Sequence, residues 1–573
     1  MFVVGSDRHR ITALAVSLLL AVAAAAGLSS DASAGTRTAA GTAATRIAPV
    51  TSCTSLGTLD LARLLTSVQA AAEVTRGGHR YCSVIGYISP QTRFEVLLPV
   101  STWTGDYLQQ GCGGFCGAVG LSLTDPSRTS GYQAPFGPLS NGELVVAADD
   151  QGHEAPSNLD TLWARNDPQL RVVFGYSSEH SIALTARALI RAYYGRDAAH
   201  RYFDGVSDGG HEALDLAQRF PTDFDGIIAG APANNWSALV GLFEPWLGRV
   251  NLDRHDRQIL SAEKLPALHT AVMRACANAS GVITDPRTCT FRPESLRCPA
   301  GTDAASCLTS AQVAVVRAFY RGPTDARGHN LFDGGMPYGS ELAWQLWAVQ
   351  PAADPAAPLD TAAAGLGLNY LRNAAFWHNP PVTLGLRDVR FTAAEHRRLQ
   401  EVGDIYDATN PDLRRFAAHG GKLIIYHGWS DQAIPPFESV DYYREVVRWS
   451  GGFGKAEAFS RLYMIPGLYH CPCGQPGDGD PATVVDMMTP LVRWVRDGVA
   501  PARLTLPVTA QSTGTPLISL SVTPFDPTSP APRNQGLNSN YHYVGYTSTY
   551  RPDAALWCRQ DGPTLRCGRH PIS

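Results

Sequence analysis

Gly205-Val206-Ser207-Asp208-Gly209 follows the pattern G-x-S-x-G, and its setting in the chain makes this short motif informative. Residues 201–203 predict a short strand before it, and residues 211–217 predict the first turns of an amphipathic helix after it. Small residues flank a serine on a sharp strand-to-helix turn because the two backbones approach closely there. Such a turn exposes the Ser207 hydroxyl above the edge of a sheet, where it can act as a nucleophile.

Two later segments supply an acid and a histidine in loops that follow strands. The apolar run 422–427 predicts a buried parallel strand, and Asp431 comes just after it. Residues 461–465 predict another strand, and His470 follows it. The order serine, acid, histidine is that of the α/β-hydrolase fold, so we predict an α/β protein with a mostly parallel, doubly wound sheet.

In this prediction His470 accepts the proton of Ser207, and Asp431 orients the imidazole. Asp431 could instead cap a helix that begins near Pro435, and Asp441 is a second carboxylate close by. The competing histidines are His153, His180 and His427. The first two precede the acid in the chain, and the third ends a strand, where a buried, hydrogen-bonded side chain is expected.

The oxyanion that forms during acyl transfer needs two backbone donors. One is predicted to be the N–H of Asp208, the residue after the nucleophile. The other is predicted in the glycine-rich loop 111–117, where Gly113 or Gly114 brings the backbone close because it has no Cβ; our first choice is Gly113.

These segments resemble the tannase and feruloyl esterase family from about Cys53 to Pro501. The resemblance is carried by the serine turn 205–209 (the nucleophile elbow) with Gly210, by 111–117, by Phe224-Asp225-Gly226-Ile227-Ile228-Ala229-Gly230-Ala231-Pro232-Ala233, by His427-Gly428-Trp429-Ser430-Asp431 and by His470-Cys471. It implies a secreted serine esterase with an inserted lid domain. The implied substrates are small esters of hydroxycinnamic, gallic or similar aromatic acids, or phenolic esters linked to plant polysaccharide.

The chain departs from the family pattern at two places. The family has a cysteine before the nucleophile, bridged to the one after the catalytic histidine, but here the first position is Val206 and Cys471 loses that partner. The family usually carries an aspartate-rich calcium loop in its lid, whereas 276–286 is short and lacks those aspartates. Calcium needs six to eight oxygen ligands, so we expect the site to be deleted and no metal or other cofactor to be required.

Twelve cysteines in an exported protein favour disulfides. Sequence proximity and the family pattern suggest four bridges: Cys53–Cys82, Cys276–Cys289, Cys298–Cys307 and Cys558–Cys567. The remaining four are Cys112, Cys116, Cys471 and Cys473. We expect bridges from the oxyanion loop to the histidine loop; the alternatives are pairing within each loop, or a zinc site built from both pairs.

More than two hundred residues separate the elbow from Asp431, far more than a minimal hydrolase needs. We therefore assign 234–410 to a lid domain, with 50–233 and 411–573 forming the catalytic domain. Helices are expected at 309–320 and 340–349. Of the lid aromatics we expect only one or two to contact substrate; the candidates are Trp236, Phe243, Trp246, Trp344, Trp347, Tyr370, Phe376 and Trp377.

The N-terminal residues have the pattern of an export signal. Basic residues precede an apolar run and a small-residue cleavage site, so 1–34 resembles a secretory signal, and 35–49 is expected to be a disordered lead-in. No membrane attachment is expected after cleavage. The net charge of -4 with 17% charged residues argues against nucleic acid as a partner. The alternatives to an aromatic esterase are an exopeptidase, a general esterase or lipase, and a non-catalytic binding protein.

Overall fold

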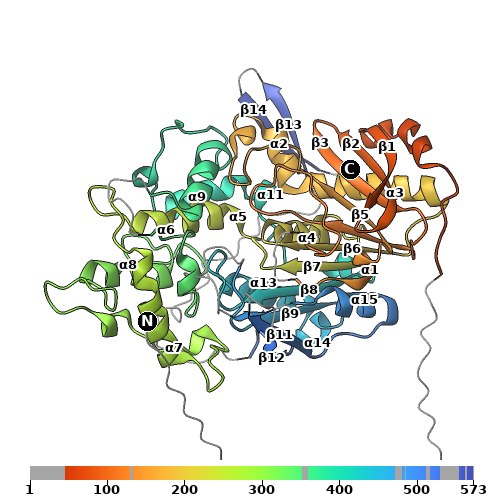
Figure 1. Ribbon diagram of the computed structural model, residues 1–573. Helices are drawn as coiled ribbons and strands as arrows, with labels where there is room; N and C mark the ends of the chain where they lie inside the picture. Colours follow the sequence, from red (N-terminus) through yellow and green to blue (C-terminus); the bar gives the residue numbers. More distant parts are fainter. Residues whose placement is uncertain are drawn as a thin grey trace, which may run out of the picture. The chain divides into compact units, whose positions relative to one another are not determined.

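The computed structural model describes residues 45–128, 133–351, 359–470, 481–483, 485–510, 516–529, 554–561 and 564–571 (Figure 1). The predicted signal and most of the predicted lead-in lie outside these residues. The chain divides into Met1–Ala44 and Thr45–Ser573, and the description below concerns the second unit.

A nine-stranded sheet organises the catalytic part of the molecule, in the order β1-β2-β3-β5-β4-β6-β7-β8-β9. The strands are β1 (Thr66–Arg76), β2 (His79–Ile88), β3 (Thr92–Pro99), β4 (Asp106–Gln110), β5 (Leu144–Asp149), β6 (His200–Val206), β7 (Gly226–Gly230), β8 (Lys422–Gly428) and β9 (Ser460–Ile465). Strands β1, β2, β3 and β5 pair antiparallel, and every pair from β5 to β9 is parallel. The predicted α/β fold is confirmed.

Successive side chains of a strand point to opposite faces of the sheet. In the parallel part of this sheet, each face packs against helices. On β6, Phe203 packs in one core with α3 (Ser178–Tyr194), α4 (Asp208–Arg219) and α13 (Phe437–Ser450). Its neighbour Tyr202 packs in the other core, with α15 (Met488–Asp497). The predicted strands at 201–203, 422–427 and 461–465 lie within β6, β8 and β9.

The segment between β7 and β8 is helical and supplies most of a third hydrophobic core, which also includes residues of the catalytic part such as Phe115, Phe174 and Ile434. Its helices are α5 (Trp236–Ala238), a π-helical turn (Leu239–Phe243), α6 (Glu244–Val250), α7 (Leu265–Cys276), α8 (Ser310–Arg321), α9 (Ala362–Asn373), α10 (Ala393–Leu399), α11 (Gly403–Tyr406) and α12 (Arg414–Ala418). Figure 1 shows α6, α7, α8 and α9 grouped together, apart from the strands of the large sheet. The assignment of 234–410 to a separate lid domain stays a prediction.

One of the two helices predicted in this segment is present and the other is not. Thr309 caps α8 with a reciprocal capping box to Gln312, which fixes its start one residue later than predicted. The helix predicted at 340–349 is wrong, because only Glu341–Trp344 forms a short 3-10 turn. Leu346 then adopts a left-handed backbone with φ 65°, which a continuing helix does not allow.

The remaining elements are small. Besides several short 3-10 turns, they comprise α1 (Gly137–Ser140), α2 (Pro168–Val172), a second π-helical turn (Val173–Ser177), α14 (Phe453–Ala456), the three-stranded sheet β10 (Pro481–Thr483), β11 (Leu504–Ala510) and β12 (Pro516–Val522), and the hairpin β13 (Ala554–Asp561) and β14 (Thr564–Pro571). Within the described residues, no helix is both long and apolar enough to cross a membrane.

Three of the predicted disulfides are present in the structure: Cys53–Cys82, Cys276–Cys289 and Cys298–Cys307. Cys558 and Cys567 lie directly opposite each other in the β13–β14 register, which suits the fourth pair, although their side chains lie outside the described residues.

Candidate active site

Ser207 occupies a strained turn between β6 and α4. Its backbone has φ 68° and ψ -118°, and its N–H donates to the carbonyl oxygen of Gly230 at 2.9 Å. The flanking glycines are required by close contacts: a Cβ at Gly205 would collide with the carbonyl oxygen of Gly209, and a Cβ at Gly209 would lie 2.9 Å from the carbonyl oxygen of Cys112. The pattern G-x-S-x-G therefore follows from packing, and the strain presents the serine hydroxyl to a cavity.

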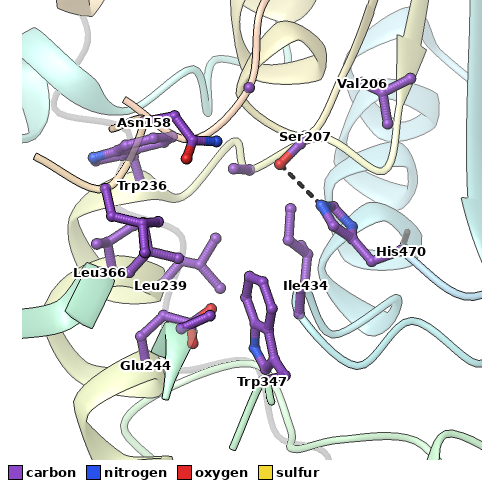
Figure 2. A pocket seen from close by; sticks show the side chains of 17 residues that line it. Asn158, Val206, Ser207, Trp236, Leu239, Glu244, Trp347, Leu366, Ile434 and His470 are labelled. Atoms are coloured by element: carbon purple, nitrogen blue, oxygen red, sulfur yellow. Dashed lines mark hydrogen bonds between the residues drawn. The ribbon is translucent and has the colours of Figure 1, made fainter. Parts of the chain in front are cut away.

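Ser207, His470 and Asp431 form a continuous hydrogen-bonded chain. The Oγ of Ser207 lies 2.9 Å from Nε2 of His470, and Nδ1 of His470 lies 2.7 Å from Oδ2 of Asp431 (Figure 2). The backbone N–H of His470 also donates to Oε1 of Gln432 at 3.1 Å. The loops after β8 and β9 thus bring together Asp431 and His470, which are 39 residues apart in the sequence. His470 in turn lies next to Ser207, which precedes it by 263 residues.

Asp431 is buried and held on both oxygens. Its Oδ1 accepts hydrogen bonds from the N–H groups of Ala433 and Ile434, at 2.9 and 2.8 Å. Burial by itself would raise the pKa of this carboxyl, but the charge of His470, with hydrogen bonds from His427 and His470, outweighs it and holds the pKa well below its usual range. Asp431 is therefore ionised throughout the pH range in which a histidine titrates.

The competing residues have other partners, although His427 also adjoins the acid, with its Nε2 3.3 Å from Oδ2 of Asp431. His427 is fully buried, with Nδ1 2.7 Å from Oγ of Ser439 and Nε2 3.0 Å from the carbonyl oxygen of Ile434. Asp441 pairs with Arg444 on α13. His180 pairs with Asp223 at 2.6 Å, and His153 stacks on Trp163.

The glycine-rich loop lies against the N-terminus of α4. The N–H of Gly209 donates to the carbonyl oxygen of Cys112 at 2.9 Å, which ties the loop to the turn after Ser207. Gly113, Gly114 and Ser207 all line one cavity. Gly114 has φ 66°, and a Cβ there would lie 2.5 Å from the carbonyl oxygen of Asn158. The loop thus brings its backbone to the serine at a point where side chains do not fit.

The predicted bridges between the oxyanion loop and the histidine loop are contradicted for Cys112 and Cys116, which are joined to each other. Left-handed φ values at Gly114 and Cys116 turn the loop back on itself and bring the two Cα atoms to 5.7 Å. Cys471 and Cys473 lie outside the described residues. The paired sulfurs approach Asp208 and Glu212, but a sulfur within a disulfide is not available as a thiolate ligand for zinc.

A group of buried acids lies beneath this loop. Asp208 begins α4, and Glu212, one turn later, accepts from the N–H of Cys112 at 3.2 Å. Burial raises the pKa of Asp208 and of Glu212 well above their usual range, and nearby carboxylates raise that of Glu212 further. The raised pKa values favour the protonated, uncharged form of both acids in this buried position.

A cavity of about 410 Å³ opens beside Ser207 and His470 (Figure 2). Its walls are mostly apolar and come from the inserted segment and from the catalytic part; they include Trp236, Leu239, Val240, Trp347, Leu366 and Ile434. Of the eight lid aromatics named above, Trp236 and Trp347 line it. The other six aromatic side chains lie in the hydrophobic core of this region or pack against it.

The segment expected to have lost its calcium loop forms a simple turn after α7. The side chain of Asn278 accepts from the N–H groups of Ser280 and Val282. Asp285 is the one carboxylate of 276–286, and it pairs with Arg287 at 2.8 Å. The absence of a metal requirement stays a prediction.

Comparison with known proteins places these observations in a family. Residues 73–537 match the family model described as tannase and feruloyl esterase. The chain belongs to the tannase and feruloyl esterase family. It is accordingly an ester hydrolase of the feruloyl esterase and tannase type, and the resemblance drawn from its motifs is confirmed.

Two curated relatives and two solved structures illustrate the breadth of this family. An uncharacterized esterase of Xanthomonas campestris pv. campestris is 32% identical, and the mono(2-hydroxyethyl) terephthalate hydrolase of Piscinibacter sakaiensis is 30% identical; each alignment covers 74% of this chain and 77% of the relative. Feruloyl esterase B from Aspergillus oryzae superimposes with a TM-score of 0.68 at 22% identity, covering 82% of this chain and 95% of that chain. Tannin acyl hydrolase from Aspergillus niger gives 0.62 at 21%, covering 83% and 92%. The two structures share the fold of this tannase and feruloyl esterase family member.

Three residues of the site were missed from the sequence. Gln432 fixes the backbone of His470, and Asn158 and Glu244 line the cavity. Gln432 directly follows Asp431, so its position next to the predicted acid could have suggested a role in the site. Asn158 and Glu244 are not within any motif, and only the folded chain brings them to the cavity.

Proposed function

We propose that the protein is a secreted serine carboxylic-ester hydrolase that cleaves esters of aromatic acids of the hydroxycinnamic or gallic type through an acyl-enzyme. The observation that carries the proposal is the hydrogen-bonded chain Ser207–His470–Asp431 at the edge of an apolar cavity. Family membership supplies the reaction class, and the cavity walls suit a flat aromatic ring.

In this mechanism the Oγ of Ser207 attacks the ester carbonyl carbon while Nε2 of His470 takes the hydroxyl proton. Asp431 fixes the imidazole tautomer through Nδ1 and stabilises the imidazolium. The N–H groups of Asp208 and Gly113 stabilise the oxyanion of the tetrahedral intermediate. The intermediate collapses to the acyl-enzyme, and His470 gives the proton to the departing alcohol. In the second half of the reaction His470 takes a proton from water, which attacks the acyl carbon, and then returns the proton to the Oγ of Ser207.

Export and the absence of a metal requirement belong to the same proposal. The disulfides suit an oxidising compartment, and the described loop after α7 does not gather carboxylates. The natural substrate is then a small aromatic ester or a phenolic ester on plant polysaccharide.

A substrate panel with a Ser207→Ala control tests the proposal. Wild type is expected to hydrolyse methyl ferulate or methyl gallate, and Ser207→Ala to lose roughly 10⁴-fold or more in kcat with its melting temperature preserved. Peptide 4-nitroanilides and long-chain lipid esters test the exopeptidase and lipase alternatives. Activity on those alone, or activity of Ser207→Ala within tenfold of wild type, would contradict the proposal.

A further inference from the structure

The cavity beside Ser207 contains polar atoms that the protein does not satisfy. Among the described residues, Oε2 of Glu244, Nε1 of Trp347 and Nε1 of Trp236 are buried without a hydrogen-bond partner. All three side chains line the cavity. The Glu244 carboxyl and the Trp347 indole interact with each other, but neither atom makes a hydrogen bond of normal geometry. Most buried polar groups in proteins are hydrogen-bonded, so we expect a polar group of a ligand to complete this set.

Glu244 is placed there by an irregular stretch of helix. It begins α6 directly after the π-helical turn Leu239–Phe243, and its side chain is 2% exposed. π-helical turns are rare and occur often at functional sites because they rotate the following side chains. In Figure 2, Glu244 lies across the cavity from Ser207, with Trp347 beside it.

The chemistry around Glu244 limits what it can bind. The described lining residues include one carboxyl, that of Glu244, and neither lysine nor arginine. Burial, and then the charge of Asp431, raises the pKa of Glu244 well above its usual range, while the Trp347 indole partly opposes this. A neutral carboxylic acid both donates and accepts a hydrogen bond, so it suits a hydroxyl group. A carboxylate on the ligand would add a second buried negative charge close to Asp431.

We propose that Glu244 binds a hydroxyl group at the far end of the acyl ring, so that the enzyme selects esters of 4-hydroxylated aromatic acids over unsubstituted and 4-carboxylated ones. This inference rests on the proposed function and adds the residue that sets its specificity. The ring lies between the apolar walls, with its ester carbonyl at Ser207 and its hydroxyl at Glu244.

The test compares three esters that share one alcohol: methyl 4-hydroxycinnamate, methyl cinnamate and methyl 4-carboxycinnamate. We expect wild type to prefer the first over the second by about tenfold or more in kcat/KM, because a site built for a hydroxyl rejects its absence. Methyl 4-carboxycinnamate is expected to react at least about tenfold more slowly than methyl cinnamate.

Two substitutions and a matched control assign this preference to Glu244. Glu244→Leu should bring the ratio between the first two esters to about one, and Glu244→Gln, which keeps a neutral donor and acceptor, should hold it within about threefold of wild type. Glu263→Leu, at an exposed position away from the cavity, should leave the ratio unchanged. Each ratio is internal to one variant, so a partly unfolded preparation does not alter it.

The outcomes separate the inference from the function on which it rests. A wild-type ratio near one, or a high ratio that survives in Glu244→Leu, overturns the inference while hydrolysis itself stands; the wild-type ratio needs no variant to fold. If wild type hydrolyses none of the three esters, nor methyl ferulate or methyl gallate, the proposed function fails and the inference fails with it.

Discussion

Asp431 illustrates how one residue serves both the loop and the proposed chemistry. One oxygen accepts two backbone N–H groups and shapes the turn after β8, and the other meets Nδ1 of His470. Asp431 does not cap the following helix, because α13 begins at Phe437 and has no side-chain cap; its hydrogen bonds shape the turn before that helix instead. The low pKa of the carboxyl means that it stays charged beside the histidine.

Asp431→Asn is expected to lower kcat on methyl ferulate by roughly 10³–10⁴-fold with a small change in melting temperature. The amide oxygen can still accept the turn N–H groups, but an amide facing Nδ1 favours the wrong imidazole tautomer. Asp441→Asn is the matched control, since Asp441 pairs with Arg444, and it should keep kcat within about threefold. Equal losses in both variants would contradict the role given to Asp431.

At this scale the sequence identified the residues that lie in local motifs. Ser207, Asp431 and His470 each follow a recognisable strand, and parallel strands deliver such residues to one edge. The pairing of Cys112 with Cys116 depends on left-handed φ values within a four-residue loop, and no sequence pattern specifies these. Glu244 reaches the cavity only through the packing of the inserted segment.

At the scale of elements, α3 and β5 meet through buried acids. Glu179 on α3 and Asp149 at the end of β5 are both buried, and Gln109 on β4 donates to Glu179. Burial, and then the charge of Asp149, raises the pKa of Glu179 well above its usual range. An unfolded glutamate ionises near pH 4, so the stability that this acid contributes is fully present below about pH 4 and is lost as pH rises through its folded pKa.

Glu179→Gln is expected to be more stable than wild type at pH 8 and about equal to it at pH 4. The amide mimics the protonated acid, accepting from Gln109 without ionising in either state. The melting temperature of the variant should exceed that of wild type by about 2 °C or more at pH 8. Glu401→Gln, at an exposed position, should show no such divergence. A variant less stable than wild type at both pH values would show that Glu179 is ionised in the folded protein.

The elements themselves were predictable where periodicity was strong. β8 and β9 contain short, continuous apolar runs, as expected for strands buried on both faces, whereas the apolar residues of β6 are interrupted by Asp204 and Gly205. The segment 340–349 was mistaken for a helix because its apolar residues have a helical spacing, whereas Leu346 leaves the helical conformation. Tertiary packing, with Trp344 fully buried, overrides the local pattern there.

At the scale of the whole molecule, Arg171 on α2 ties the catalytic part to the inserted segment. Its guanidinium is buried and donates to the carbonyl oxygens of Phe376 and Asn373, each at 2.7 Å, to Oδ1 of Asn379 at 2.8 Å and to the carbonyl oxygen of Ala164 at 2.8 Å. One planar group thus satisfies one acceptor of the catalytic part and three of the inserted segment.

Arg171→Lys is expected to lower the free energy of unfolding by about 3 kcal/mol, because an ammonium cannot reach all four acceptors and leaves some buried and unpaired. Thermal or urea unfolding measures this, with Arg196→Lys, at an exposed position, as the matched control. A change below about 1 kcal/mol would indicate that water replaces the lost donors.

EDTA is expected to leave the melting temperature and the activity unchanged. A metal bound to the native state raises stability by a few kcal/mol when it saturates its site, and a melting curve registers the loss. A downward shift on adding EDTA, reversed by calcium, would show that the segment after α7 retains a metal site.

Covalent labelling of Ser207 tests the central claim most directly. The enzyme is treated with an arylphosphonate ester that reacts with activated serines, and the labelled peptide is identified by mass spectrometry while hydrolysis of methyl ferulate is followed. The account predicts one phosphonate per chain, on Ser207, appearing in step with the loss of activity, and negligible labelling of Asp431→Asn on the same time scale. Full activity after stoichiometric labelling of Ser207, or loss of activity with the phosphonate on another residue, would contradict it.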